Sequence, residues 1–312
     1  MAIDVKEVEQ EGYGKCLALN NGVVEILVTI DIGPRIIHFG LIGGNNIFYQ
    51  DREHPETVHT PEFEELYAGL ENRQYRLYGG HRLWLSPQNR AATYYPDNQP
   101  VVYGITPDGV SFTPPIQHHN KMQVSLTVMM PEGASDIMLI HSAKNMGKEN
   151  RSFSICSITA LKGGGLEIIP KNPSINNFAP NQEYVMWPYS QMTDPRVHWG
   201  KKYVTIHHNP GYEPEFKMGT NNALNWAAYV HQDVVLVKRY VHELKAIYPD
   251  GGASFETYCN SRYLEMETLS PVYRIEPGET IKHVENLTLY PVNTTVHPTD
   301  QNLLDQFIST LL

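Results

Sequence analysis

Two glutamates, Glu265 and Glu267, stand two residues apart in the segment YLEMETLSP, which covers residues 263–271. Side chains alternate across a β-strand, so a strand here places both carboxylates and Tyr263 on one face. Two neighbouring carboxylates repel each other, and the repulsion raises the affinity of one of them for a proton. A carboxyl group tuned in this way can act as a general acid or base near neutral pH, and glycosidases divide these roles between two carboxylates. The alternative is a solvated outer face, where glutamates are common.

The segment just before these glutamates favours a cleft. In FETYCN, the side chains of Glu256, Tyr258 and Asn260 alternate along a predicted strand and share one face. Tyrosine offers an aromatic surface to a sugar ring, while amides and carboxylates bind sugar hydroxyls. We therefore predict a sugar site in which Glu265 or Glu267 is catalytic, and in which Tyr258 and Asn260 bind the substrate.

A second candidate segment is RLYGGHRLWLSPQ, residues 76–88. Its paired glycines allow a close backbone approach or unusual backbone angles. In a strand that follows them, Arg82 and Trp84 share one face and His81 takes the other. A segment rich in arginine, histidine and tryptophan beside two glycines predicts part of the ligand cleft. The alternative is a buried turn with Trp84 in the core.

Three further residues are candidates for substrate binding. Arg35 follows a Gly-Pro pair in a predicted hairpin, where it either meets the ligand or serves as a structural charge. His198 belongs to the aromatic-rich stretch WPYSQMTDPRVHW, which either walls a sugar cleft or covers the sandwich. Lys238, like Lys217, is flanked by apolar or aromatic residues and suits an anionic sugar, although with its neighbour Arg239 it also fits a charge pair at a strand edge.

The fourteen histidines raise the question of a metal site. His118-His119 and His207-His208 are adjacent pairs, and adjacent residues of a strand point to opposite faces, so neither pair can chelate one ion well. The sequence contains no HExxH or CxxC motif and no phosphate-binding or dinucleotide-binding glycine motif. A site that joins histidines of different strands stays open, but the sequence does not argue for one. We therefore predict no metal and no cofactor.

Composition narrows the class of protein. The formal net charge of −10 argues against a nucleic-acid partner, and three widely spaced cysteines fit reduced thiols better than disulfides. No apolar run reaches the roughly 18 residues that a membrane helix needs, and the first residues lack the apolar core of a secretory signal. We expect a cytoplasmic protein with a small-molecule sugar or sugar derivative as its partner, and no membrane partner. The sequence sets no oligomeric state.

The elements that must position these residues are mostly strands. Short apolar or alternating runs recur about every ten to fifteen residues and are separated by glycine and proline turns, which is typical of an all-β sandwich or barrel. Helical spacing is limited to residues 61–73 and to 299–312, where Thr299 or Asp300 can cap a C-terminal helix. We find no linker or repeat, so residues 1–312 are predicted to form a single domain.

Four segments together resemble the galactose mutarotase-like superfamily, in an aldose 1-epimerase-like branch. They are GPRIIHFGLIGGNNIFY, YGGHRLW, ITALKGGGLEIIP and YLEMETLSPVYRIEPGETIKHVENLTLY, and the resemblance extends from about residue 20 to 292. It implies an all-β fold, a β-supersandwich with a few short helices and a C-terminal helix, whose concave face binds a hexose. It also implies an aldose 1-epimerase (mutarotase) reaction, in which a carboxylate general base acts at the anomeric hydroxyl.

The resemblance carries over to individual residues with two departures. The family's base lies in an LET-like context, which Glu265 matches by following leucine and Glu267 by preceding threonine, so both remain candidates. The family's HGG segment matches Tyr78 and the two glycines, with tyrosine in place of the sugar-binding histidine. The family's general-acid histidine falls in ITALKGGG, which contains no histidine.

The missing general acid leaves several hypotheses open. His81, His198 or Lys238 supplies the acid of a mutarotase, or the reaction is a different one. A non-catalytic carbohydrate-binding protein on the same scaffold is the first alternative. A glycoside hydrolase or lyase that uses the glutamate pair is the second.

Overall fold

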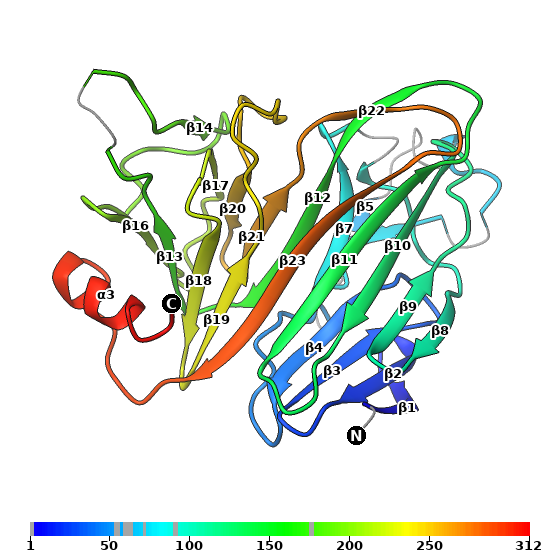
Figure 1. Cartoon of the computed structure of the whole chain (residues 1–312), viewed down its shortest axis with the longest axis horizontal. Helices are drawn as coiled ribbons and strands as arrows, with labels where there is room; N and C mark the ends of the chain where they lie inside the picture. Colours follow the sequence, from blue (N-terminus) through cyan, green and yellow to red (C-terminus); the bar gives the residue numbers. More distant parts are fainter. Residues whose placement is uncertain (1–2, 53–56, 59–64, 71–72, 90–92, 175–177) are drawn as a thin grey trace.

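The computed structural model describes residues 3–52, 57–58, 65–70, 73–89, 93–174 and 178–312. Its strands are arranged in two large sheets that lie against each other, and its C-terminal helix sits beside one of them (Figure 1). Every strand pairing in these sheets is antiparallel. None of the helices in the described part of the chain is long and apolar enough to span a bilayer.

The larger sheet has eleven strands among the described residues, and we call it the eleven-stranded sheet. In spatial order it contains β1 (Asp4–Gln10), β2 (Gly14–Asn20), β3 (Val24–Thr29), β4 (Ile36–Leu41), β7 (His81–Ser86), β12 (Arg151–Lys162), β21 (Tyr263–Leu269), β20 (Phe255–Cys259), β17 (Phe216–Thr220) and β14 (Tyr184–Met186), with β22 (Tyr273–Ile275) paired to β12. The central strands therefore come from the first, middle and last thirds of the chain.

The second sheet has ten strands among the described residues, and we call it the ten-stranded sheet. Its spatial order is β15 (Val197–Trp199), β16 (Tyr203–His207), β13 (Leu166–Pro170), β18 (Trp226–His231), β19 (Val234–Arg239), β23 (Thr280–Pro291), β11 (Asp136–Asn145), β10 (Met122–Met129), β9 (Gly109–Thr113) and β8 (Val102–Thr106). A short separate pair joins β5 (Thr57–Val58) to β6 (Tyr75–Arg76).

The main core lies between the two sheets. Alternate apolar residues of each strand enter one buried cluster, as do Leu264 and Met266 of β21 in one sheet and Leu287 and Leu289 of β23 in the other. Alternation follows from the strand period of two, so the residues between these face away from the core. The predicted all-β sandwich is confirmed.

The C-terminal helix α3 (Gln301–Ile308) begins as the sequence predicts. Asp300 caps it, because its Oδ1 accepts hydrogen bonds from the backbone N–H groups of Asn302 and Leu303. Leu304 and Phe307 pack in a second cluster with residues of the ten-stranded sheet that alternate with its core residues. The helix therefore covers the outer face of that sheet. Of the helix expected over residues 61–73, positions 61–64 and 71–72 lie outside the described residues.

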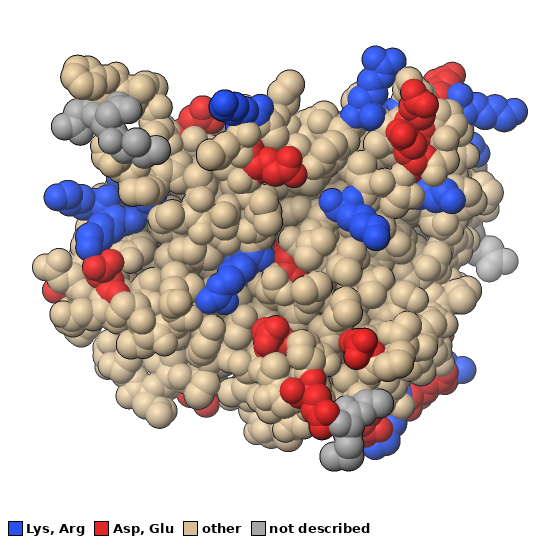
Figure 2. Space-filling model, in the orientation of Figure 1, with Lys and Arg blue, Asp and Glu red and all other residues tan. Residues whose placement is uncertain are grey.

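The charged surface is mixed on the face of the molecule shown in Figure 2, where acidic and basic side chains are interspersed among wide uncharged areas. The buried interior also contains ionisable groups. Glu167 of β13 points into the core, because its neighbours in the strand pack under α3. The hydroxyl of Thr257 donates to its Oε2 at 2.7 Å, while its Oε1 has no hydrogen-bond partner among the described residues. Burial raises the pKa of Glu167 from 4.5 to about 8.

We expect Glu167 to make the protein less stable as the pH rises. The folded state keeps the carboxyl protonated to a higher pH than the unfolded chain does, so its contribution is complete below pH 4.5 and is lost towards pH 8. Relative to Glu167→Gln, the free energy of unfolding of the wild type should fall by about 1 kcal/mol per pH unit across this range. Urea unfolding at several pH values measures the free energy of unfolding of both proteins. The same dependence on pH in the two proteins would refute the prediction.

Candidate functional site

A row of charged residues crosses the outer face of the eleven-stranded sheet. In the strand register, Ile158 of β12 stands between Arg82 of β7 and Glu267 of β21, and Glu267 stands opposite Glu256 of β20. Paired residues of neighbouring strands share a face, so Arg82, Glu267 and Glu256 all point away from the core. Glu265 lies in the next row on the same face. The predicted placement of the two glutamates on one face is confirmed.

Lys217 of β17 ties two of these carboxylates together. Its Nζ lies 2.9 Å from Glu256 Oε2 and 2.8 Å from Glu267 Oε1. The thiol of Cys156 donates to the other oxygen of Glu267 at 3.5 Å. The ammonium group also lies 4.7 Å from the centroid of the Trp187 ring, within cation–π range. A single ammonium group thus contacts the carboxyl groups of two buried glutamates.

This arrangement sets the protonation of the cluster. Burial disfavours the charged form of Lys217, but Glu267 and Glu256 outweigh it and hold the pKa of Lys217 well above its ordinary value. Burial raises the pKa of Glu256 from 4.5 to about 8, against the opposing pull of Lys217. Glu256 therefore carries a proton near neutral pH beside a charged lysine.

The pKa of Glu265 is also raised, but its charged neighbours are different ones. Burial is the main cause that raises the pKa of Glu265 to about 7, Glu267 adds to it, and Arg82 opposes it. The guanidinium of Arg82 lies 4.0 Å from Glu265 Oε1 and stacks 4.4 Å above the Trp84 ring. The repulsion predicted from the sequence is present, but burial is the larger effect.

A pocket of about 570 Å³, counting space open to solvent, lies beside this cluster. Its walls include the indoles of Trp84 and Trp187 and the side chains of Lys217, Glu256 and Glu267. Indoles offer flat apolar surfaces, and the lysine and carboxylates offer hydrogen bonds. The arrangement can hold a ring that carries hydroxyl groups and can exchange protons with it.

Two of the predicted binding residues lie near one another at the end of β20. Tyr258 stands opposite Glu265 in the register and donates from its hydroxyl to Glu215 at 2.6 Å. Asn260 Oδ1 accepts from the backbone N–H groups of Arg262 and Tyr263, so it shapes the turn between β20 and β21. Its Nδ2 lies 3.5 Å from the Tyr258 hydroxyl.

The structure corrects the expected positions of His81 and Lys238. Both side chains are 0% exposed and lie between the two sheets, not with the glutamates. His81 precedes Arg82 in β7, so the two side chains take opposite faces. Lys238 of β19 points inward, and its Nζ lies 3.3 Å from Glu285. Neither residue reaches the pocket beside Lys217.

Arg35 and Tyr78 lie together but apart from that pocket. The guanidinium of Arg35 contacts Asp97 at 2.6 Å and stacks 5.0 Å above the Tyr78 ring. Arg35 and Arg82 line a different pocket of about 770 Å³, counting space open to solvent. His198 is on β15, an edge strand of the ten-stranded sheet, so it shares no sheet with the glutamates.

The two glycines before β7 behave as predicted. Gly79 and Gly80 have φ angles of +79° and +70°, which favour glycine. A Cβ at Gly80 would lie 2.3 Å from the carbonyl oxygen of Ile36, so the glycine lets β4 approach β7. This close approach lies immediately before β7, the strand that carries Arg82 and Trp84.

Lys217 and Trp187 are candidates from the sequence that it does not place beside the glutamates. Lys217 suits an anionic sugar, and Trp187 begins the aromatic-rich stretch that either walls a cleft or covers the sandwich. The segment FKMGT places Phe216 and Met218 in the core and Lys217 on the opposite face, which is a period-two signal. Trp187 follows β14, and its backbone N–H donates to the carbonyl of Lys217. Their contact with the glutamate cluster depends on strand order, which no local pattern predicts.

Comparisons with known proteins agree on the fold. No family model matches the sequence, and no curated protein does. A candidate aldose 1-epimerase from Klebsiella pneumoniae subsp. pneumoniae is similar in structure with a TM-score of 0.63 at 12% identity, over 98% of this chain and 86% of that protein. A galactose mutarotase-like protein from Clostridium acetobutylicum gives 0.54 at 11% identity, over 93% and 99%.

A TPR-domain containing protein from Parabacteroides distasonis is also similar, with a TM-score of 0.56 at 15% identity. The match covers 92% of this chain but spans only 49% of that protein's length. Identities this low establish a shared architecture and nothing about chemistry. The chain therefore has the galactose mutarotase-like fold, a β-supersandwich with a C-terminal helix.

Proposed function

We propose that this protein binds a hexose-like sugar in the pocket beside Lys217 and interconverts its anomers, as an aldose 1-epimerase does. The observation that carries the proposal is the pocket itself, in which the indoles of Trp84 and Trp187 flank carboxylates bridged by one lysine. Aromatic faces with a few convergent polar groups are typical of sugar sites. No cofactor takes part in the proposed reaction.

Glu267 is the proposed base and Glu256 the proposed acid. Glu267 lines the pocket, whereas Glu265 is not among the residues that line it. A carboxylate takes the proton of the anomeric hydroxyl while a protonated group gives one to the ring oxygen, so the ring opens to the free aldehyde. Rotation about the C1–C2 bond and closure with the proton transfers reversed give the other anomer. The raised pKa of Glu256 supplies a proton near neutral pH.

The charges around the pocket favour a neutral sugar. Lys217 already contacts two carboxylates, and Asp250 also lines the pocket. Among the described lining residues, acidic side chains outnumber the lysine, and that lysine already contacts two of them. A negatively charged ligand would therefore be repelled more than attracted. We therefore place sugar acids and sugar phosphates below neutral hexoses as substrates.

NMR exchange spectroscopy tests the activity directly. We expect the protein to accelerate the exchange between the α and β anomers of at least one neutral aldose, in a panel that also contains uronic acids and sugar phosphates. Protein denatured by heat is the control for trace buffer catalysis. If the protein accelerates anomer exchange for none of the sugars in the panel, the proposed enzymatic activity is wrong.

A non-catalytic sugar-binding protein is the second candidate. It is favoured by one observation: no histidine is among the described residues that line the pocket. The resemblance noted in the sequence implies a histidine as general acid, so this role must fall to another group or be absent. Calorimetric binding of a sugar without any acceleration of exchange would support this candidate.

A further inference from the structure

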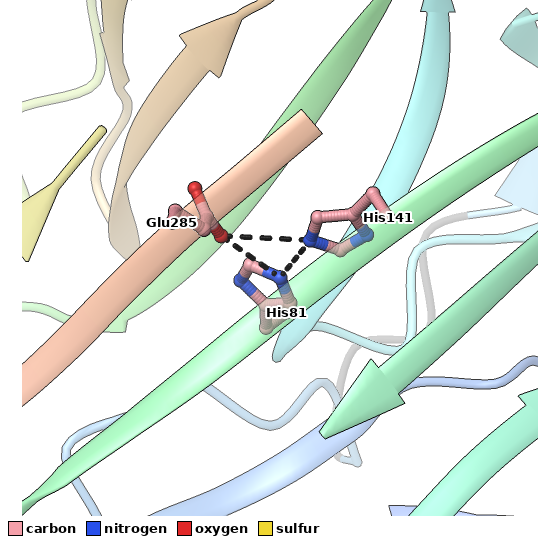
Figure 3. Close-up of side chains that lie close together, drawn as sticks. All are labelled: His81, His141 and Glu285. Carbon is pink, nitrogen blue, oxygen red and sulfur yellow. Dashed lines mark hydrogen bonds and ion pairs between the residues drawn. The ribbon is translucent and has the colours of Figure 1, made fainter. Parts of the chain in front are cut away.

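Three donor atoms from three strands converge in the space between the sheets (Figure 3). His81 Nε2 lies 2.9 Å from His141 Nε2 and 3.2 Å from Glu285 Oε1, and His141 Nε2 lies 3.5 Å from the same oxygen. β7 belongs to the eleven-stranded sheet, and β11 and β23 belong to the ten-stranded sheet. All three side chains are fully or almost fully buried.

We propose that His81, His141 and Glu285 bind one divalent transition-metal ion between the sheets. Donors bound at about 2.1 Å to one ion lie about 3.0 Å apart at a right angle and about 3.4 Å apart at a tetrahedral angle. The three observed separations fall close to this range. Two imidazoles and one carboxylate are a ligand set used by zinc and by non-haem iron.

The surroundings orient the donor atoms. Thr268 donates to the second oxygen of Glu285 at 2.7 Å, and His81 Nδ1 lies 2.9 Å from the hydroxyl of Thr159. Such outer contacts fix the ring and the carboxylate so that Nε2 and Oε1 face the ion. Burial lowers the pKa of His81. Burial opposes the ionisation of Glu285, but its neighbours, Lys238 foremost, lower the pKa of Glu285.

Ser157 offers a fourth donor. Its Oγ lies 2.7 Å from Glu285 Oε1 and within 3.3 Å of both imidazole nitrogens. His141 is also among the residues that line the pocket of about 770 Å³. The Nδ1 of His141 is buried and has no hydrogen-bond partner among the described residues.

Lys238 limits the strength of binding. Its Nζ lies 3.3 Å from Glu285 Oε2 and donates to the hydroxyl of Thr159 and to two backbone carbonyls. Because a lysine ammonium repels a divalent cation, Lys238→Met should tighten metal binding. In a plain hydrogen-bonded network without a metal site, the same substitution would not create affinity for an ion. The sign of this effect therefore separates the two explanations.

The ion would join the two sheets directly behind the candidate sugar site. Ser157 and Thr268 pair across β12 and β21, and they directly follow Cys156 and Glu267, which line the candidate site on the opposite face. An ion that binds only the folded protein stabilises it by mass action. We therefore assign the site a structural role that fixes β7 against the second sheet.

Metal titration of chelator-treated protein tests the proposal. We expect Zn²⁺ to bind with one ion per chain in calorimetry and to raise Tm, and Co²⁺ at the same site to show visible d–d absorption. Glu285→Gln and His141→Gln should each weaken Zn²⁺ binding at least a hundredfold and reduce the rise in Tm. Lys238→Met should strengthen it.

His283→Gln is the matched control. His283 is also a buried histidine of β23, but its Nε2 contacts the hydroxyl of Thr268 at 2.9 Å and not the other three donors. This variant should keep the affinity for Zn²⁺ within a few-fold. The wild-type titration decides even if a ligand variant fails to fold. Absence of Zn²⁺ and Co²⁺ binding, or binding unaffected by the loss of Glu285 or His141, would overturn the proposal.

Discussion

Glu267→Gln is expected to reduce the rate of anomer exchange by a factor of about 10² to 10⁴, the usual contribution of a positioned acid or base. Glutamine keeps the size of the side chain and can still accept a hydrogen bond from Lys217, but it cannot take the anomeric proton. The affinity for the sugar should change only a few-fold. Exchange NMR gives the rate, calorimetry gives the affinity, and circular dichroism verifies the fold.

Glu265→Gln is the matched control for this prediction. The two glutamates belong to the same strand and face and are both buried, but only Glu267 lines the pocket. We expect Glu265→Gln to reduce the rate less than tenfold. The opposite order of effects would assign the base to Glu265. Two variants with the rate of the wild type would exclude the glutamate pair from the chemistry.

Lys217→Met is expected to lower the free energy of unfolding by about 3–5 kcal/mol at neutral pH, because it leaves the buried carboxylate of Glu267 without its cation. The lysine side chain is 12% exposed, and Glu256 and Glu267 are more buried still. Methionine has a similar length, so a cavity contributes little. Urea unfolding at neutral pH measures this loss of stability.

Lys202→Met provides the comparison. Lys202 also contacts a carboxylate, Asp305, at 2.6 Å, but its side chain is 51% exposed. Exposed ion pairs contribute at most about 1 kcal/mol, so this variant should be almost as stable as the wild type. If Lys217→Met cost no more than Lys202→Met, the cluster at the pocket would not be electrostatically coupled as described.

Local patterns in the sequence predicted the parts of the site that lie within one strand. Alternation in YLEMETL placed Glu265 and Glu267 on one face, and alternation in HRLW separated His81 from Arg82 and Trp84. Both follow from the strand period, which needs no knowledge of the partners. The all-β class and the C-terminal helix were predicted from the same kind of signal.

Strand order and sheet stacking were not predictable from local patterns. Lys217 meets Glu267 because β17, β20 and β21 are neighbours, although the two residues are 50 positions apart in the chain. His81, His141 and Glu285 meet only because two sheets pack face to face. The pairs His118-His119 and His207-His208 are visible because they are adjacent in sequence, whereas a cluster of side chains from three separate strands leaves no local pattern.

The alternation within β21 has a consequence for engineering. Positions 263, 265 and 267 share the outer face of the sheet, where Glu267 lines the pocket, and positions 264 and 266 face the core. Under the proposed function, position 267 bears on the ligand, whereas positions 264 and 266 bear on the stability of the core. A substitution at position 267 would then alter the site and leave the core residues of the same strand unchanged. An insertion or deletion of one residue here would exchange the two sets and damage both properties at once.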